Sequence, residues 1–440
     1  MKSILILGAG RSATTLIDYL IAHSKVFDWH VRVADIDLEL AKRKIRDSKS
    51  ATAIALNINN ERQRQDLIAQ SDVVVSMLPP HMHLIIAQDC LRFGCHLLTA
   101  SYLSKEMEEL HQMAKSRNLL FLNEMGLDPG IDHMSAMAIK ARILEMGGQI
   151  SSFQSYTGGL IDRASDSNPW HYKISWNPRN VVLAGRDTAS FREEGKVKFL
   201  SYHQLFEQFT VIEILGGEKF EMYPNRDSLK YLDTYGLQDA ETLIRGTLRH
   251  MGFCKGWSVL VKLGLTDPYL TIKPGTFGTY AELLSAFLPK TEENMSEHTR
   301  ICLGINDPVV CNQLEWLFDN TPLPPQEATA ADLLQMLLVE KWNLHPDDLD
   351  LVVMHHEFEY SVGPASFRLR STLRQKGRSS IDTAMTKLVG LPLAIATKLL
   401  LNNVLTVRGV QIPVLPAIFQ PVLDELELEG VKFEEEITPC

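Results

Sequence analysis

The chain has 440 residues, too many for a single hydrophobic core, so we expect two or three domains. Its formal charge of −10 argues against a nucleic-acid-binding protein, which would normally carry a basic face. Six scattered cysteines without a Cys-x-x-Cys pair predict neither a disulfide framework nor a zinc site, and no stretch approaches the ~20 apolar residues of a membrane span. Together these features predict a soluble cytoplasmic protein.

The first element is a short apolar run that breaks into two glycines. This strand-like run ends at Gly8-x-Gly10-x-x-Ala13, and an amphipathic helix follows. Gly8 lets the chain turn, Gly10 leaves room for a pyrophosphate, and Ala13 lets helix and strand pack closely. The first N–H groups of the helix, around Arg11 and Ser12, would face that anion. The stretch therefore predicts a dinucleotide-binding turn.

A second strand, at residues 30–35, ends in a carboxylate. Asp35 lies 25 residues after Gly10, where a nicotinamide-dinucleotide site places the acid that binds the adenosine ribose. Such an acid accepts hydrogen bonds from both ribose hydroxyls and repels a 2′-phosphate, which favours NAD over NADP. The alternative is that Asp35 is a solvated residue that caps the helix beginning near Leu38.

Strands and helices continue to alternate, which predicts an α/β fold with a doubly wound parallel sheet of six strands. Further strands are expected at 53–56, 73–77, 96–99 and 119–122, with helices at 61–70, 81–93 and 104–117. Ligands bind beyond the carboxyl ends of such strands. The loops at 78–80, 99–102 and 124–130 are therefore the candidate binding loops.

The pattern changes after Gly130, where a helix at 132–146 precedes a series of strand-like runs. These runs lie at 150–156, 181–184, 196–199, 211–215, 218–223, 351–360 and 361–370. They predict a mixed α+β substrate-binding and dimerisation domain, made of residues 131–250 and 350–379. Helices expected at 257–263, 280–288, 308–317 and 330–341 predict a small helical insertion, residues 251–349. We expect residues 380–440 to complete the dinucleotide-binding domain of residues 1–130.

Several longer motifs follow the glycine turn. They are Thr99-Ala100-Ser101-Tyr102, the stretch 126–134 with Gly126-Leu127-Asp128-Pro129-Gly130, Gly158-Gly159-Leu160, Asn168-Pro169, Tyr172-Lys173-Ile174-Ser175-Trp176, Tyr223-Pro224-Asn225-Arg226-Asp227-Ser228 and Arg245-Gly246-Thr247-Leu248-Arg249. In this order, and over essentially the whole chain, they resemble saccharopine dehydrogenase of the glutamate-forming type. That family includes the fungal saccharopine reductases and the dehydrogenase half of the bifunctional lysine-degrading enzyme. Carboxynorspermidine-forming enzymes would share the glycine turn but not all of the later motifs.

The resemblance implies a Rossmann-like dinucleotide domain and a reversible oxidation of a secondary amine. Saccharopine gives a hydride to the nicotinamide, and the resulting imine is hydrolysed to glutamate and 2-aminoadipate 6-semialdehyde. We expect a homodimer that uses NAD in lysine breakdown. The alternatives are an NADP-linked reductase of lysine synthesis, a carboxynorspermidine-type amine dehydrogenase, and a dinucleotide-binding regulator without turnover.

The resemblance also implies which residues bind the substrate, which carries three carboxylates and two amines. Arg226 and Arg249 would each grip a carboxylate with a planar fork. Asp128 would pair with an ammonium group, and Ser101 and Thr247 would donate hydrogen bonds. Tyr102, at the end of the fifth strand, would lie near the nicotinamide.

By the same similarity, a second set of residues borders the cofactor. Ala100, Ser101, Leu127, Asp128 and Asn177 would border cofactor, substrate or both. Asn57, Ile58 and Leu78 would line the adenine side and the approach to the nicotinamide.

The residue that moves the proton is left open. Many relatives have a cysteine before the Gly-Gly pair, where this chain has Thr157, so a thiol is not needed here. Asp128, Tyr102, Lys173 and water are the candidate acceptors, of which we take Tyr102 and Asp128 as the catalytic residues.

Each of these residues has a simpler interpretation. Arg226 could be a surface arginine, Asp128 a turn residue and Tyr102 a packing residue at a strand end. Arg245, taken to lie one helical turn from Arg249, could exchange roles with it.

The histidine pairs are the remaining conspicuous feature. His355 and His356 would point to opposite faces of a strand, and no cysteine or carboxylate completes a ligand set for them or for His81 and His83. We therefore expect structural histidines and no metal.

The arginine assignment predicts the behaviour of one variant. Arg226→Ala should weaken the affinity for the substrate and leave NAD binding nearly unchanged, because the guanidinium would contact only the substrate. Binding titrations with each ligand measure this. Equal loss of both affinities would show instead that Arg226 has a structural role.

Overall fold

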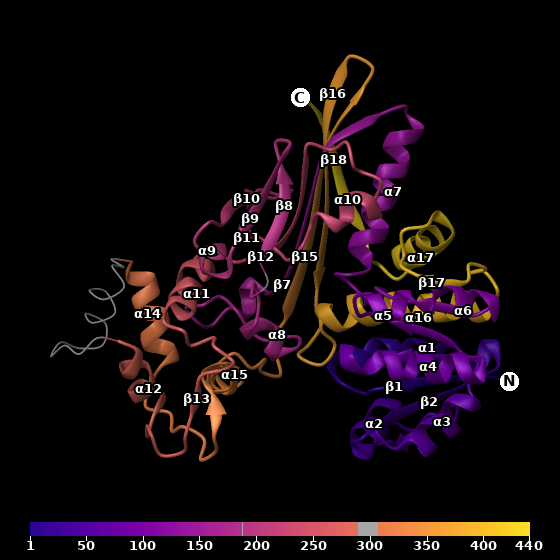
Figure 1. The fold of residues 1–440 in the computed structure, drawn as a ribbon, viewed down its shortest axis with the longest axis horizontal. Coiled ribbons are helices and arrows are strands. Elements are labelled where there is room, and N and C mark those ends of the chain that lie inside the picture. The colour runs from indigo at the N-terminus through magenta and orange to yellow at the C-terminus, as the bar shows by residue number, and fades with distance from the viewer. Residues whose placement is uncertain (187, 289–306) are drawn as a thin grey trace. The chain divides into compact units, whose positions relative to one another are not determined.

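The computed structural model describes residues 1–186, 188–288 and 307–440 (Figure 1). The chain divides into two compact units, which are described separately. The first contains residues 1–149 and 381–433, and the second contains residues 150–380 and 434–440. The first segment of the dinucleotide-binding unit thus ends at residue 149, where the sequence predicted residue 130. Residues 434–440, which were expected in the first unit, belong to the second.

The first unit is built on a parallel sheet of seven strands in the order β17-β6-β5-β4-β1-β2-β3. The strands are β1 (Lys2–Leu7), β2 (Trp29–Asp35), β3 (Ala51–Ala55), β4 (Val73–Ser76), β5 (His96–Thr99), β6 (Leu120–Leu122) and β17 (Gly409–Gln411). The apolar centre of β4 is buried, as expected of a strand covered on both faces. The sequence predicted six of these strands and missed β17, which adds to the edge from the C-terminal segment.

Helices cover both faces of this sheet. One face carries α1 (Thr14–Phe27), α2 (Leu38–Ile45) and α16 (Ala384–Leu401), and α17 (Pro416–Leu428) packs on both α16 and α7 (Ile131–Glu145). The other carries α3 (Glu61–Ala69), α4 (His83–Phe93), α5 (Lys105–Glu108) and α6 (His111–Ser116), whose apolar side chains share a core with β1, β4 and β5. Two short 3-10 turns, η1 (Arg11–Ala13) and η2 (Pro80–Met82), precede α1 and α4. The contacts of α7 with α17 place residues 131–145 in this unit, which the sequence had assigned to the second domain.

Helix α16 is the apolar helix of the first unit. By length and composition alone it could cross a membrane, although no such stretch was expected, and 78% of its apolar window is buried. It packs against α1, where a Cβ on Gly390 would lie 2.9 Å from the Leu16 nitrogen and 3.1 Å from the Ser12 carbonyl oxygen. The burial of α16 and its close approach to α1 are typical of a core helix, and α16 thereby supports the segment that follows the glycine turn.

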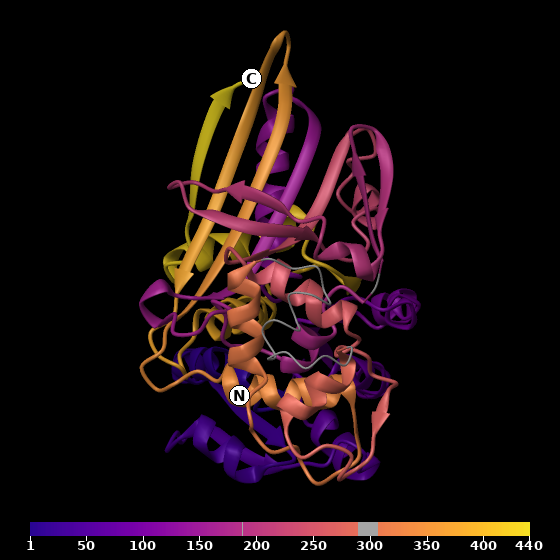
Figure 2. The ribbon, with the colours of Figure 1, turned by 90° about the vertical axis from the view of Figure 1, so that its left-hand side faces the viewer.

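The second unit is built on a nine-stranded mixed sheet, whose main path is β10-β11-β12-β7-β15-β16-β18. The strands are β7 (Gln149–Ile161), β8 (Ala189–Glu193), β9 (Lys196–Leu200), β10 (Thr210–Glu213), β11 (Lys219–Pro224), β12 (Thr242–Arg249), β15 (Asp350–Val362), β16 (Ala365–Lys376) and β18 (Phe433–Pro439). β12 pairs with β7 in parallel, whereas β11–β12 and β15–β16 are antiparallel. Figure 2 shows the long β15–β16 hairpin in orange with the yellow β18 beside it. The predicted combination of a parallel sheet and a mixed sheet is confirmed.

Helices and a two-stranded sheet complete the second unit. They are η3 (Arg163–Ser165), α8 (Pro178–Val182), α9 (Tyr202–Leu205), α10 (Lys230–Thr234), α11 (Phe253–Lys262), α12 (Tyr280–Phe287), β13 (Thr271–Ile272), α14 (Pro308–Leu317), β14 (Ala328–Thr329) and α15 (Ala330–Lys341). Trp257 and Trp342 of this helical part share one hydrophobic core with Trp170, between η3 and α8, and with Tyr223 of β11. The predicted insertion 251–349 therefore shares one core with the rest of this unit. Part of that range, 289–306, lies outside the described residues.

Two local predictions in this unit are wrong. Residues 181–184 were expected in a strand, but Val181 and Val182 lie in the helix α8, whose start is set by the Asn177 cap and by Pro178 at its first position. Arg245 and Arg249 were taken to be one helical turn apart, but both lie on β12. Positions four apart on a strand share a face, so the two arginines still point the same way.

The contact at Gly390 predicts the stability of two variants. Gly390→Ala should lower the free energy of unfolding by about 1–3 kcal/mol, because the added methyl group meets the backbone of α1. Gly10→Ala is the control, since a Cβ there would meet nothing within 4 Å, and its stability should stay within about 0.5 kcal/mol of wild type. Urea unfolding measures both. Equal stability of Gly390→Ala and the wild-type protein would contradict the packing argument.

Candidate functional site

The turn between β1 and α1 has the backbone that a dinucleotide site needs. Gly8 has a φ of +100°, and a Cβ there would lie 3.1 Å from the Met77 carbonyl oxygen, so only glycine fits. Gly10 is exposed, and the space a side chain would fill is open. Ala13 is buried, Arg11 is exposed, and no side chain caps the turn that begins at Gly10. The open backbone and the uncapped N–H groups fit a bound pyrophosphate.

Asp35 lies beside this turn at the carboxyl end of β2. Its Oδ2 accepts a hydrogen bond from the Ala9 nitrogen at 2.7 Å, and its Oδ1 accepts one from the Asp37 nitrogen at 2.9 Å. The cap of α2 is Asp37, whose Oδ1 accepts from the Leu40 nitrogen at 3.1 Å. The interpretation of Asp35 as a helix cap is therefore wrong. Its carboxylate lies next to the glycine turn, where the ribose is expected.

The three residues expected near the adenine lie in the loops after β3 and β4. Asn57 is exposed, and its Oδ1 accepts from the Asn59 nitrogen at 3.0 Å. Ile58 is buried in the core that α3, α4, α5 and α6 share with the sheet. Leu78 packs against the same core and remains partly exposed. Asn57 and Leu78 are thus accessible at the carboxyl ends of their strands, whereas the side chain of Ile58 is mostly in the core.

The loops after β5 and β6 bring the two predicted catalytic residues together. The Tyr102 hydroxyl donates to Asp128 Oδ1 at 3.3 Å. Both side chains are partly exposed, whereas neighbouring Leu127 is buried. A Cβ on Gly126 would lie 3.0 Å from the Ala100 Cβ, so small residues let the two loops pack closely. A phenol and a carboxylate in contact can accept and pass on a proton.

His83 belongs to the same edge of the sheet, although the sequence indicated only a structural histidine. Its Nδ1 lies 2.9 Å from Ser76 Oγ, and its Nε2 lies 2.7 Å from Ser101 Oγ and 3.2 Å from Thr99 Oγ1. Burial, with a smaller effect from His81, lowers the pKa of His83 from 6.5 to about 4, so the imidazole is neutral near pH 7. It holds the Ser101 hydroxyl. Its place just after the predicted loop 78–80 was the signal that could have identified it.

The predicted carboxylate-binding residues lie in the second unit. Arg226 is exposed in the loop after β11, with a φ of +53°. Arg249 is 3% exposed, and its guanidinium carbon lies 5.1, 5.8 and 5.2 Å from the ring centres of Tyr172, Tyr223 and Phe253. Its buried Nε has no hydrogen-bond partner among the described residues. The rings fix this cation by cation–π contacts and leave an N–H to donate.

Thr247 lies between two strands that present further hydroxyl groups. It pairs with Tyr223 of β11 on one side and with Thr157 of β7 on the other. Burial raises the pKa of Tyr223 to about 12, so its phenol stays protonated. The Thr157 hydroxyl is buried without a partner among the residues described.

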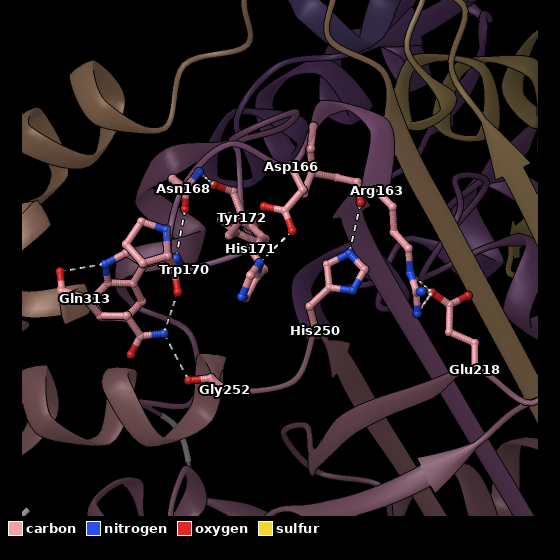
Figure 3. A network of polar contacts seen from close by, with 12 residues as sticks. Arg163, Asp166, Asn168, Trp170, His171, Tyr172, Glu218, His250, Gly252 and Gln313 are labelled. Carbon is pink, nitrogen blue, oxygen red and sulfur yellow. Dashed lines mark hydrogen bonds and ion pairs between the residues drawn. The ribbon is translucent and has the colours of Figure 1, made fainter. Parts of the chain in front are cut away.

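A network of polar contacts holds the segment that contains Tyr172, one of the three rings around Arg249 (Figure 3). Asn168 Nδ2 donates to the Tyr172 carbonyl at 2.9 Å, and the Trp170 nitrogen donates to Asn168 Oδ1 at 2.9 Å. Trp170 Nε1 donates to the Gln313 carbonyl at 3.0 Å, which ties the loop to α14. The Asn168-Pro169 motif therefore has a structural role that positions Tyr172.

Two further predicted residues of this unit are engaged elsewhere. Lys173 is buried, with its Nζ 2.7 Å from Asp348 Oδ2, and an ammonium in a buried ion pair is a poor proton acceptor. The prediction that Lys173 is a candidate base is therefore wrong. Asn177 is exposed, and its Oδ1 caps α8 by accepting from the Arg179 nitrogen at 2.9 Å. Its role at the cofactor stays a prediction.

Both histidines of β15 are buried. His355 Nδ1 lies 2.7 Å from Thr372 Oγ1, and burial lowers the pKa of His355 to about 4. Within residues 1–186, 188–288 and 307–440, no group of three or more His, Cys, Asp or Glu side chains could hold a metal ion.

Comparisons with known proteins match the chain along nearly its whole length. The family model described as "Saccharopine dehydrogenase NADP binding domain" matches residues 4–122, and the one described as "Saccharopine dehydrogenase C-terminal domain" matches residues 126–431. The Schizosaccharomyces pombe protein named saccharopine dehydrogenase (NADP(+), L-glutamate-forming) is 32% identical, with 99% of both chains covered. Alpha-aminoadipic semialdehyde synthase of Arabidopsis thaliana is also 32% identical, and the match covers 99% of this chain and 45% of that protein. The solved apo structure of saccharopine dehydrogenase (L-Glu forming) from Saccharomyces cerevisiae is similar with a TM-score of 0.90 and 30% identity, over 100% of both chains.

The buried state of His83 predicts a pH dependence of stability. Its pKa is lower in the folded protein than in the unfolded chain, so the unfolded chain binds the proton first as the pH falls. The contribution of His83 is complete above pH 6.5 and is lost toward pH 4, on the order of 3 kcal/mol in all. His83→Gln, which does not titrate, should lose this part of the slope in urea unfolding measured across that range.

A matched control separates burial from the mere presence of an imidazole. His203 lies exposed on α9, so His203→Gln should keep the full slope of the wild-type protein. An unchanged slope in His83→Gln would contradict the burial argument.

Proposed function

The chain belongs to the saccharopine dehydrogenase family, and on that premise we propose that it oxidises saccharopine to L-glutamate and 2-aminoadipate 6-semialdehyde in lysine metabolism. The contact between Tyr102 and Asp128 is the observation that carries the proposal. It lies in the unit that holds the glycine turn, at the edge of the sheet where parallel strands end.

The residues of the first unit must orient the substrate and move one proton. When bound, the oxidised nicotinamide supplies the hydride acceptor. The secondary amine has to lose its proton before the hydride leaves, and we assign that proton to the Tyr102–Asp128 pair. The Ser101 hydroxyl, held by His83 Nε2 at 2.7 Å, is oriented to donate a hydrogen bond to substrate or cofactor.

The residues of the second unit supply cations for the substrate's carboxylates. Arg249 is rigid because three aromatic rings surround it, and its unpartnered Nε favours a role as a carboxylate donor. Arg226 is exposed and so is accessible to a second carboxylate. Thr247 lies on the same face of β12 as Arg249 and completes this proposed group.

We also propose that the cofactor is NAD and that the reaction serves lysine breakdown. Asp35 supports NAD, because its carboxylate is fixed beside the glycine turn and would repel a 2′-phosphate. The names of several relatives specify NADP(+), which is the alternative for this chain. The preference is therefore a property to measure directly.

Kinetics with both cofactors test activity and preference together. Saccharopine with NAD should raise the absorbance of the reduced nicotinamide, with kcat/KM higher for NAD than for NADP. Asp35→Ser should improve kcat/KM with NADP by about tenfold or more, because it removes the repelling charge.

Asp37→Ser is the matched control, since serine also caps a helix and Asp37 serves α2. It should keep the preference of the wild-type protein. A wild-type preference for NADP would refute the Asp35 argument, and binding of NAD without turnover of saccharopine would refute the proposed activity.

A further inference from the structure

A buried hydrogen bond connects the loop after β6 to the first turn of α7. His133 Nε2 lies 2.7 Å from Glu124 Oε2, and the two side chains are 0% and 5% exposed. A carboxylate and an imidazole removed from water are costly unless they are paired, so this contact is expected to be rigid. Both residues lie in segments that the sequence marked, the candidate loop 124–130 and the motif 126–134, but neither was given a role of its own, and neither has one in the proposed chemistry.

Glu124 holds the backbone on both sides of Tyr102. Its nitrogen donates to the Ser101 carbonyl at 3.0 Å, and its Oε1 accepts from the Leu103 nitrogen at 2.9 Å. The residue before Tyr102 and the residue after it are thus both fixed by one glutamate. The direction of the Tyr102 side chain therefore depends on where the Glu124 carboxylate is held.

The backbone conformation of Glu124 is one that surrounding contacts must stabilise. Its φ of +58° lies in the left-handed region, which non-glycine residues seldom occupy. Such a conformation costs on the order of 1 kcal/mol and persists where surrounding contacts determine it. Here the contacts to Ser101, Leu103 and His133 supply that determination.

The first turn of α7, which carries His133, is tied to the loop that carries Asp128. Around it, the Ile131 nitrogen donates to the Gly126 carbonyl at 2.9 Å, and the Gly130 nitrogen donates to Asp132 Oδ1 at 2.6 Å. A Cβ on Gly130 would lie 2.0 Å from the Gly126 carbonyl oxygen, so this loop is closed tightly. Glu124 begins the loop that carries Asp128 and His133 follows it, so the bond between them ties the two ends of that loop, while Glu124 also bonds the backbone beside Tyr102.

We propose that Glu124 and His133 are positioning residues that set the contact between the Tyr102 hydroxyl and the Asp128 carboxylate. We call the pair a clamp: the Glu124–His133 bond closes the loop after β6, which carries Asp128, and the bonds of Glu124 to Ser101 and Leu103 join that loop to the loop after β5. The two residues act on the reaction only through Tyr102 and Asp128. The inference rests on the proposed function for its effect on catalysis. The clamp itself is testable without turnover.

Amide hydrogen exchange tests the clamp in the ligand-free protein. His133→Phe removes the partner of Glu124, so the Leu103 amide should exchange at least about tenfold faster. His96→Phe is the matched control, because the His96 ring also takes part in a hydrogen bond, with Nδ1 accepting from the Leu120 nitrogen, but His96 lies at the start of β5. It should leave Leu103 unchanged. Unchanged exchange of Leu103 in His133→Phe would overturn the clamp.

Kinetics then test positioning against a merely structural role. His133→Phe should lower kcat by about tenfold or more and leave the KM for the dinucleotide within about twofold. His133→Gln retains an N–H donor for Glu124 and should recover most of the lost kcat. A kcat near wild type in folded His133→Phe would overturn the positioning role, even if Leu103 exchanged faster.

A double-mutant cycle shows whether the effect passes through Tyr102. Tyr102→Phe combined with His133→Phe should lose little more kcat than the more damaging single variant, because both changes disable one group. Losses that multiply would overturn the proposal.

If His133→Phe does not fold, Glu124→Gln, which is matched in size, is judged by the same cycle. If the wild-type protein does not oxidise saccharopine, the proposed function fails, and the exchange experiment alone decides on the clamp.

Discussion

The parallel alignment of strands in the first unit is the constraint on which the candidate site depends. Because the strands run the same way, their carboxyl ends meet at one edge, and the register keeps them level: Leu7 pairs with both Ala34 and Ser76, and Ser76 pairs with Thr99. Segments distant in sequence thus deliver a glycine turn, a carboxylate, a tyrosine and an aspartate to one edge of one sheet. A crossover helix between successive strands makes this arrangement possible.

Local hydrogen bonds then decide how well each group is held at that edge. Asp35 is fixed by two backbone N–H groups, and Ser101 by a neutral, buried His83. Buried polar groups must find partners, so these bonds both stabilise the loops and orient the side chains. In the second unit, Arg249 is held differently, because aromatic rings restrict a cation without neutralising it.

Elements with strong local signals could be predicted from the sequence. Helix α14 and helix α15 have the predicted bounds, since capping residues and an apolar stripe both lie in the local sequence. The glycine turn was likewise identifiable, because its small residues are required whatever surrounds them. Strand β17 was missed because it is three residues long and is stabilised by pairing with β6. The spacing of Arg245 and Arg249 was read as one helical turn because positions four apart share a face in a helix as well as in a strand.

The sequence by itself determined the family and the dinucleotide turn and predicted the candidate site residues, because these depend on motifs whose residues are adjacent in the chain. Only the tertiary structure decided that Tyr102 contacts Asp128, that Asp37 and not Asp35 caps α2, and that Lys173 is held by Asp348. It also revealed His83 and the Glu124–His133 clamp. Such pairings depend on distances between side chains from different elements, and those distances are set by packing that no local pattern encodes.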